Sequence, residues 1–391
     1  MRKVLYFFPD DVGIPTSGNK TRVRCLLNYF KKRSFDVHFV SLKHERDTVL
    51  QHQDTADILY NDGLASRISF LTRKASKKNL LRYFFKYKIW DLIYYYKRLP
   101  LRTSIPAVIT SNLLREFEEI LKVNTYDYII ISYVYYSDLV LKSSLLGDSK
   151  IIIDTHDFIT AQYKTRRNFR LGVTMEDEIR RLNRFHEIWA ISPEEQYIFR
   201  QFCKPDVRLV PFTMKTPVIN ASLVGRQYHI IYVASDNRHN IRAASWFFSE
   251  VYPLLPANLK ICVVGKIGSH INDSVAIERV LYSGDLSTYY NDSYVAICPM
   301  FSGSGVKIKV IEALSYGLPV ICTDYGADGL PNKVNNGCIV HNDAVSFARS
   351  LVEILQNEPL YKCHSNHAKS LFQKYFSSEN LEKVLDPVFS D

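Results

Sequence analysis

The chain has 391 residues, of which 47% are apolar in the wide sense, with 15 Gly and 15 Pro. This composition excludes a disordered or collagen-like chain, and the length is sufficient for two domains. The net charge of +10 points to an anionic partner.

Apolar runs typical of strands alternate with helical patterns through the first half of the chain. We expect strands over 4–8, 36–42, 128–133, 150–154, 187–192 and 207–211, and a helix over 20–33. This alternation predicts βαβ units around a parallel sheet.

The same rhythm restarts after residues 215–227, a polar stretch with Pro217 and Gly225 that we interpret as a linker. We expect strands over 229–234, 259–264, 279–282, 294–298 and 318–322, and helices over 243–255, 306–316 and 360–376. The sequence therefore predicts an α/β protein with two doubly wound, Rossmann-like domains facing a cleft, the first over 1–214 and the second over 215–375. Ligands of such sheets bind beyond the carboxyl ends of the strands.

The seven cysteines are scattered and form no Cys-x-x-Cys pair, so we expect buried, reduced thiols. The apolar run 4–8 is closed by Pro9, Asp10 and Asp11, too early for the core of a signal peptide. The longest strongly apolar stretch, 128–136, is shorter than the roughly 20 residues that span a bilayer. We therefore expect a cytoplasmic protein.

A glycine-rich loop, Ser-Gly-Ser-Gly-Val over 302–306, follows an expected strand and leads into an expected helix. Glycines let backbone amides approach a phosphate, and the start of a helix adds positive potential. The residues expected to bind the phosphate are Gly303, Ser304, Gly305, Val306, Lys307 and Lys309. The alternative is a glycine-rich turn that only starts a helix.

Glu312 lies seven residues after Gly305, about two helical turns further on. A carboxylate in this position can accept hydrogen bonds from a ribose diol, as acids do in dinucleotide folds. The alternative is a solvated or salt-bridged glutamate.

Residues 302–330 resemble the C-terminal signature of retaining family 4 glycosyltransferases and their GT-B-fold relatives. That signature has an acid, seven residues, a second acid, and then Ala, Gly, Pro and Val. The chain keeps Glu312, Ala313, Gly317, Pro319 and Val320. It has Ser304 in place of the first acid, which resembles a branch with a Gly-Ser-Gly loop and a lysine three residues before the glutamate.

Other segments extend the resemblance. Residues 282–286, with Asp285, look like the family segment beside the donor base, and 235–255 resembles the opening of the family's C-terminal domain. By this resemblance Arg238 is the best available cation there for a diphosphate.

Residues 9–22 resemble the family loop after the first strand, in which Gly18 lets the backbone approach the donor. His156, in the segment 153–157, looks like the family histidine that reaches the donor sugar or the acceptor side. A lone loop histidine is more often structural, but the accompanying motifs favour the functional interpretation.

We expect no metal and no resident cofactor. The sequence contains no Asp-x-Asp, and no Gly-x-Gly-x-x-Gly follows the first strand. Gly265–Lys266 lacks the spacing of a P-loop, and Cys363, His364 and His367 lack a fourth zinc ligand.

Residues 73–102 carry much of the positive charge, with ten Lys or Arg, one acid and eight aromatics. Lys78, Arg82 and Lys86 repeat every four residues along one helical stripe, opposite an apolar side. Basic and aromatic faces together are typical of a helix that lies on an anionic membrane. The alternatives are a core helix with extended lysine stems and, more weakly, RNA binding.

The resemblance implies an enzyme that moves a sugar from a nucleotide-sugar donor to a glycan or lipid-linked acceptor, with retention and without metal. His156, Lys309 and Glu312 would be its catalytic residues, and residues 376–391 would return to the first domain. A membrane-facing first domain favours polysaccharide or lipopolysaccharide synthesis at the inner face of the plasma membrane. The alternatives are a nucleotide-sugar hydrolase or epimerase of the same fold, or a non-catalytic nucleotide-sugar-binding module; we expect no nucleic acid partner.

Overall fold

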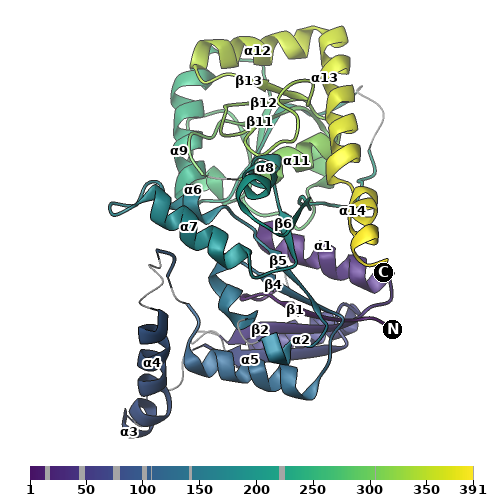
Figure 1. Cartoon of the computed structure of the whole chain (residues 1–391). Helices are drawn as coiled ribbons and strands as arrows, with labels where there is room; N and C mark the ends of the chain where they lie inside the picture. The colour runs from purple at the N-terminus through teal and green to yellow at the C-terminus, as the bar shows by residue number, and fades with distance from the viewer. Residues whose placement is uncertain are drawn as a thin grey trace. The chain divides into compact units, whose positions relative to one another are not determined.

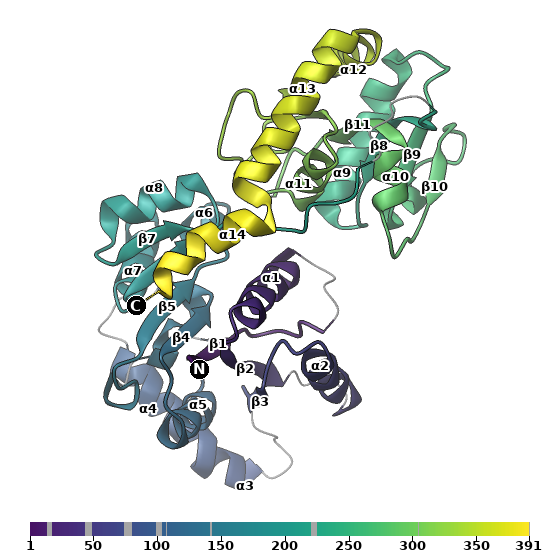
Figure 2. The same ribbon diagram turned by 90° about the vertical axis from the view of Figure 1, so that its right-hand side faces the viewer.

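The computed structural model describes residues 1–13, 18–43, 49–73, 80–98, 104–106, 108–140, 143–219, 225–303 and 305–390. It divides into two compact units, Met1–Val210 (unit 1) and Pro211–Asp391 (unit 2). Each unit is built on its own parallel sheet with helices on both faces (Figures 1 and 2). The predicted α/β class with two doubly wound, Rossmann-like sheets is confirmed.

Unit 1 contains a seven-stranded sheet in the order β3-β2-β1-β4-β5-β6-β7, and all of its pairings are parallel. Its strands are β1 (Lys3–Phe7), β2 (Asp36–Lys43), β3 (Arg67–Thr72), β4 (Tyr128–Ser132), β5 (Lys150–Asp154), β6 (Glu187–Ala190) and β7 (Asp206–Leu209). The strand order reverses direction between β1 and β4. In open α/β sheets, the loops that follow the two strands at such a reversal run to opposite faces of the sheet, and a ligand can bind in the crevice between them.

The helices of unit 1 cover both faces of its sheet. In chain order the helices of this unit are α1 (Gly18–Lys32), α2 (Val49–Asn61), α3 (Leu80–Tyr83), α4 (Ile89–Arg98), α5 (Ser111–Val123), α6 (Ile159–Tyr163), α7 (Leu171–Leu182) and α8 (Pro193–Phe202), of which α3 and α4 lie at the periphery and not on the sheet. Phe117 of α5 and Leu182 of α7 belong to the core on one face. On the other face, Phe30 of α1 packs edge-on against Tyr6 of β1.

Unit 2 contains a six-stranded parallel sheet in the order β10-β9-β8-β11-β12-β13, so its strand order reverses between β8 and β11. Its strands are β8 (Tyr228–Val233), β9 (Ile261–Val264), β10 (Glu278–Val280), β11 (Ser293–Cys298), β12 (Val320–Cys322) and β13 (Cys338–Val340). Its helices are α9 (Arg238–Trp246), α10 (Ser287–Asn291), α11 (Ile308–Ser315), α12 (Ala344–Gln356), α13 (Glu358–Leu371) and α14 (Ser378–Leu385).

Two helix starts in unit 2 differ from the prediction. Helix α9 begins five residues before the expected Ala243, because Asn237 caps it by accepting from the amides of His239 and Asn240. Helix α11 begins at Ile308 rather than Val306, because Lys307 is still extended, at φ −90° and ψ 104°. The glycine-rich loop is therefore two residues longer than the sequence indicated.

A helical segment, 80–98, is formed by α3, a π-helical turn over Phe84–Lys88, and α4; it lies at the periphery of unit 1 in Figure 1. None of its described side chains is buried. Asp91 attaches it to α5 by accepting from the amide of Ser111 at 2.7 Å. Within the described ranges, no helix is both long and apolar enough to cross a bilayer.

Candidate functional site

In unit 2, the loop between β11 and α11 has the shape that its glycines allow. Gly303 and Gly305 have φ of 99° and 76°, a region that side chains with a Cβ rarely occupy. The ammonium of Lys307 donates to the carbonyl of Gly303 at 3.2 Å and to that of Gly305 at 2.5 Å. Lys307 therefore holds the loop in its conformation. Ser304 lies outside the described residues, and Val306 is partly exposed beside the loop.

The neighbouring strand β8 brings the start of α9 to this loop. The ring Nδ1 of His239 and the hydroxyl of Ser302 lie 2.7 Å apart. The ammonium of Lys309 donates to the side-chain oxygen of Asn240 at 2.8 Å. The residues of the first pair are 63 positions apart in the sequence, and those of the second pair are 69 positions apart. Both contacts lie where the strand order of unit 2 reverses.

Lys309 carries a charge that no acid balances. It is partly exposed, and within the described part of the chain no carboxylate forms an ion pair with it. Loss of hydration lowers the pKa of its amine, and the nearby charge of Lys307 lowers it further. Its remaining favourable contact is the ring of Tyr232, whose centroid lies 5.6 Å from Nζ. An anion arriving here would find one ammonium ready to bind it.

Glu312 lies one helical turn beyond Lys309 and faces a pair of aromatic rings. Tyr290 of α10 donates its hydroxyl proton to Oε2 of Glu312 at 3.1 Å. Tyr290 in turn stacks on Tyr316, with centroids 5.0 Å apart and rings inclined by 14°. Burial raises the pKa of the Glu312 carboxyl, while the Tyr290 hydrogen bond acts in the opposite direction. The second carboxylate oxygen is left for another donor.

Arg238 and Asp285 lie at the edges of this arrangement. Arg238 is exposed at the start of α9, and its Nε donates to Nε2 of His239 at 3.4 Å. Asp285 is exposed and precedes α10; its carboxylate accepts from both the amide and the hydroxyl of Ser287, at 2.8 and 2.7 Å. These bonds lower the pKa of Asp285. Asp285 therefore stabilises the turn that leads into α10.

A separate polar cluster lies in unit 1, at the carboxyl ends of β1 and β5. Asp154 is fully buried and pairs with Arg22 of α1 at 2.7 Å. It also accepts from the hydroxyl of Tyr6 at 3.1 Å, and Arg22 donates to the carbonyl of Val210 at 2.5 Å. Burial alone would raise the pKa of Asp154, but the charges of Arg22 and His156 bring it below its usual range.

His156 belongs to this cluster and has an unusual backbone. Its φ is 59°, and that of Tyr133, at the end of the neighbouring strand, is 67°. The two rings stack with centroids 4.4 Å apart, and Nε2 of His156 lies 3.1 Å from Asp154. That approach does not meet hydrogen-bond geometry, so Nε2 has no hydrogen-bond partner among the described residues. Strained backbone of this kind is concentrated at functional sites.

Gly18 is the first residue of α1, directly after four residues outside the described ranges. Its neighbour Asn19 donates its side-chain amide to the hydroxyl of Tyr133 at 2.9 Å, so the start of α1 contacts the ring that supports His156. In unit 1 the structure therefore brings the Gly18 region and His156 to one edge of the sheet.

Of the predicted basic stripe, Lys78 lies outside the described residues, as do the side chains of Arg82 and Lys86, whose backbone is helical. Several large apolar side chains of the same segment are exposed, among them Leu81 at 74%, Phe85 at 64% and Trp90 at 57%. A core helix would bury these side chains, so that alternative is wrong for the part of this segment that is described.

Sequence reasoning missed the supporting residues of both clusters. It assigned no role to His239, Asn240, Asp154 or Tyr133. The available signal was their position: Asp154 and Tyr133 lie at or just beyond the carboxyl end of a strand, and His239 and Asn240 lie in the first turn of the helix that follows β8. Lys307 was expected to bind the phosphate together with Lys309, whereas in the structure its ammonium donates to the loop carbonyls of Gly303 and Gly305.

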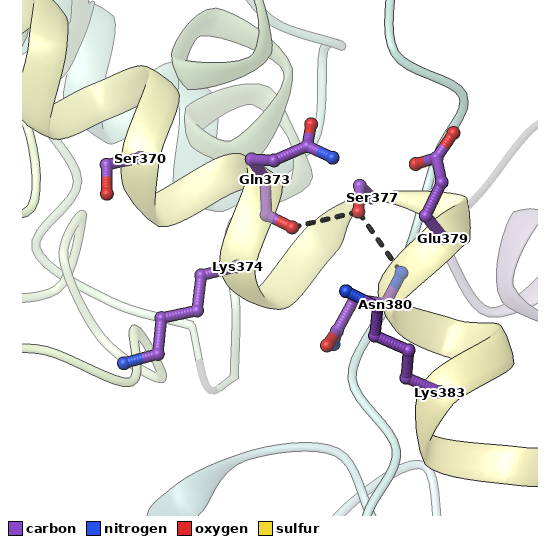
Figure 3. Close-up of a pocket in the computed structure, with 7 residues that line it drawn as sticks. All are labelled: Ser370, Gln373, Lys374, Ser377, Glu379, Asn380 and Lys383. Atoms are coloured by element: carbon purple, nitrogen blue, oxygen red, sulfur yellow. Dashed lines mark hydrogen bonds between the residues drawn. The ribbon is translucent and has the colours of Figure 1, made fainter.

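A pocket in unit 2 involves none of the predicted residues. It is lined by Ser370, Gln373, Lys374, Ser377, Glu379, Asn380 and Lys383 (Figure 3). The hydroxyl of Ser377 donates to the carbonyl of Gln373 at 2.9 Å and accepts from the amide of Asn380 at 3.2 Å. These bonds cap α14, so we assign this pocket no ligand.

Two Rossmann-like units with parallel sheets define the GT-B class of fold, and known structures agree. Sucrose-phosphate synthase from Thermosynechococcus elongatus superimposes with a TM-score of 0.69 at 14% identity, covering 100% of this chain and 98% of that one. HepE of Anabaena, in complex with UDP-glucose, gives 0.66 at 12% identity and covers 100% of both chains.

Residues 227–357, within unit 2, match the family described as Glycosyl transferases group 1. An uncharacterized 44.6 kDa protein in the cps region of Klebsiella pneumoniae is 22% identical over 360 residues, covering 81% of this chain and 87% of the relative. The family match and the GT-B fold together indicate a glycosyltransferase.

Proposed function

We propose that this protein transfers a sugar from a nucleotide-sugar donor to a glycan or lipid-linked acceptor, with retention of configuration and without a metal ion. The observation that carries the proposal is the unbalanced ammonium of Lys309 beside the start of α11. No described side chain caps the first turn of α11, and the amides of Ile308 and Lys309 have no acceptor among the described residues, so these two amides are available to the same anion. A diphosphate would form an ion pair with the ammonium and accept hydrogen bonds from the amides.

Each residue of unit 2 then has a role in the transfer. The diphosphate lies against Gly303–Val306 and Lys309, and Lys309 stabilises the negative charge that develops as the bond to the sugar breaks. A fixed positive charge there does what a metal ion does in other transferases, and this supports the metal-independent mechanism. Glu312, oriented by Tyr290, accepts hydrogen bonds from the ribose.

In unit 1, His156 is proposed to contact the sugar or the acceptor. The strained backbone of His156 and its place at the carboxyl end of β5 support this role. Retention rests on the resemblance to retaining family 4, in which the leaving phosphate accepts the acceptor proton, so we name no general base. A polysaccharide or lipopolysaccharide acceptor is supported by the relative in a cps region. A nucleotide-sugar donor is supported by the UDP-glucose bound in HepE.

A thermal-shift panel of UDP-, GDP-, dTDP- and CMP-sugars, measured with EDTA present, tests donor binding. We expect one nucleotide to raise the melting temperature, since any ligand of the native state stabilises it. Glu312→Ala should weaken that nucleotide about tenfold, the effect of one to two lost hydrogen bonds, and leave the unliganded melting temperature nearly unchanged. Glu353→Ala, at an exposed position of α12, is the control and should bind normally.

If no nucleotide stabilises the protein, or only a metal restores binding, the proposal is wrong. Release of free nucleotide with and without a glycan acceptor separates the remaining possibilities. Acceptor-dependent release supports the transferase, acceptor-independent release indicates a hydrolase, and binding without turnover indicates a non-catalytic module.

We further propose that the segment 80–98 lies on an anionic membrane. Exposed Leu81, Phe85, Trp90 and Tyr96 provide apolar contact, and the surrounding lysines and arginines provide charge. Each basic residue near such a surface contributes about 1 kcal/mol. This interaction would bring the enzyme to a lipid-linked acceptor.

Sedimentation with vesicles of anionic and of zwitterionic lipid tests the membrane proposal. We expect salt-sensitive binding to the anionic vesicles, reduced about 100-fold or more in Lys78→Glu/Arg82→Glu/Lys86→Glu, since three charges are reversed. Lys122→Glu/Lys204→Glu/Lys260→Glu changes the net charge equally at exposed positions elsewhere and should pellet like the wild type. Unchanged pelleting of the first triple variant would contradict the proposal.

A further inference from the structure

Asn240 has an uncommon set of contacts for a helix residue. It is 4% exposed and lies in the first turn of α9. Its Oδ1 accepts from the ammonium of Lys309 at 2.8 Å. Its Nδ2 donates to the carbonyl and hydroxyl oxygens of Ser235, at 3.0 and 3.1 Å. The carboxamide is therefore held at both ends, and its oxygen has a fixed position.

The neutrality of this side chain matters for Lys309. An aspartate has nearly the same shape and would form an ion pair with the ammonium, which would then have less attraction for another anion. A neutral oxygen directs the ammonium without cancelling its charge. The ring of Tyr232, with its centroid 5.6 Å from Nζ, acts in the same way, because it attracts a cation but carries no charge.

We propose that Asn240 is a positioning residue, which fixes the ammonium of Lys309 toward the donor diphosphate while leaving its positive charge available. This inference rests on the proposed function, because it assigns Asn240 a part in the same donor site. Its hydrogen bond to Lys309 connects the first turn of α9 to the first turn of α11.

A purely structural role would have a different signature. In that case Asn240 would serve to fix the turn at Ser235, and its replacement would have the same effect whether or not Lys309 is present. If Asn240 acts through Lys309, the two residues are coupled, and a double-mutant cycle measures this coupling directly.

The experiment measures binding of UDP and of GDP by calorimetry at fixed ionic strength, in the wild type, Asn240→Ala, Asn240→Asp, Lys309→Met and the two double variants. We expect Asn240→Asp to weaken binding of the preferred nucleotide about 30-fold or more, the cost of a buried charge in competition with the ligand. Asn240→Ala should weaken binding only about threefold to tenfold, since the ammonium keeps its charge but loses its orientation. In the Lys309→Met background Asn240→Ala should have little further effect, and the effect of Asn240→Asp should be smaller than in the wild-type background, because only its direct repulsion of the diphosphate remains.

Asn336→Asp is the matched control in the same unit. Asn336 is 2% exposed, its Nδ2 donates to the carbonyl of Asn332 at 2.8 Å, and its Oδ1 accepts from the amide of Cys338 at 2.9 Å. The control therefore loses the same kind of bond and gains the same charge, but at a position without a lysine contact. It should bind the nucleotide normally.

Where Asn240→Ala does not fold, Asn240→Ser replaces it, because its hydroxyl retains a hydrogen-bonding group near Ser235. An Asn240→Asp variant that binds like the wild type overturns the inference, as does an effect that persists undiminished in the Lys309→Met background. Both results leave the donor site itself intact. A wild-type protein that binds neither nucleotide instead overturns the proposed function, and the inference with it.

Discussion

Replacing Lys309 by methionine should reduce kcat/KM about 100- to 1,000-fold, the usual effect of removing one preorganised group that stabilises transition-state charge. The protein should nevertheless remain folded, with a melting temperature equal to or above that of the wild type. The reason is that the amine of Lys309 is poorly hydrated and forms no ion pair with a described acid, so its removal takes away a cost of folding. A variant that loses activity but does not lose stability identifies a residue whose role is to bind the ligand.

Steady-state kinetics with the preferred donor and differential scanning calorimetry of the unliganded protein are the two measurements. Lys362→Met is the control, because Lys362 is exposed and pairs with Glu358 on the surface of α13. It should change neither quantity appreciably. Retention of more than a tenth of the wild-type kcat/KM in Lys309→Met would contradict the proposed role.

The second large effect should come from Asp154→Asn, which we expect to lower the free energy of unfolding of unit 1 by about 3–5 kcal/mol. The substitution keeps the shape of the side chain but leaves the buried guanidinium of Arg22 without a counter-charge. Removing both charges, in Arg22→Met/Asp154→Leu, should restore part of the loss, since the unpaired charge is the main cost. Urea denaturation, with hydrogen exchange to assign the transition of unit 1, measures the effect.

The difference in the free energy of unfolding between the wild type and Asp154→Asn should depend on pH in a definite direction. The pKa of Asp154 is lowered in the folded state, so the stabilisation that its carboxylate provides is present above the unfolded pKa and is lost as the pH falls toward the folded pKa. The difference between wild type and variant should therefore be largest near neutral pH and shrink below about pH 4. A difference that stays constant down to pH 2 would contradict the assignment.

The fold could be predicted because alternation of short apolar runs and helical patterns is a local property. Strand β5, Lys150–Asp154, agrees with its predicted bounds. Strand β3 escaped detection because its sequence, RISFLT, buries only Leu71 and resembles a surface segment. The start of α11 was misplaced because it depends on the positive φ of Gly303 and Gly305 and on the extended Lys307, none of which produces a hydrophobic period.

Side-chain partners at the site were less predictable than the residues themselves. Position after a strand singled out Lys309 and Glu312, but pairing of Lys309 with Asn240 requires the β8–β11 neighbour relation across 69 residues. Which of Lys307 and Lys309 contacts the loop depends on where α11 begins. A shift of that start by two residues changes the direction of both side chains. Sequence spacing alone could not assign one lysine to the loop and the other to the ligand.

The central place of β1 has a practical consequence for handling the protein. Strand β1 pairs with β2 on one side and β4 on the other, and the amide of Lys3 donates to Asp127 at 2.6 Å. Shortening the chain from this end would therefore separate β2 and β3 from the other four strands of the sheet of unit 1, and would not merely remove an edge strand. Because parallel strands all point the same way, an affinity tag placed before Lys3 would emerge at the edge opposite His156, where it should not obstruct a ligand.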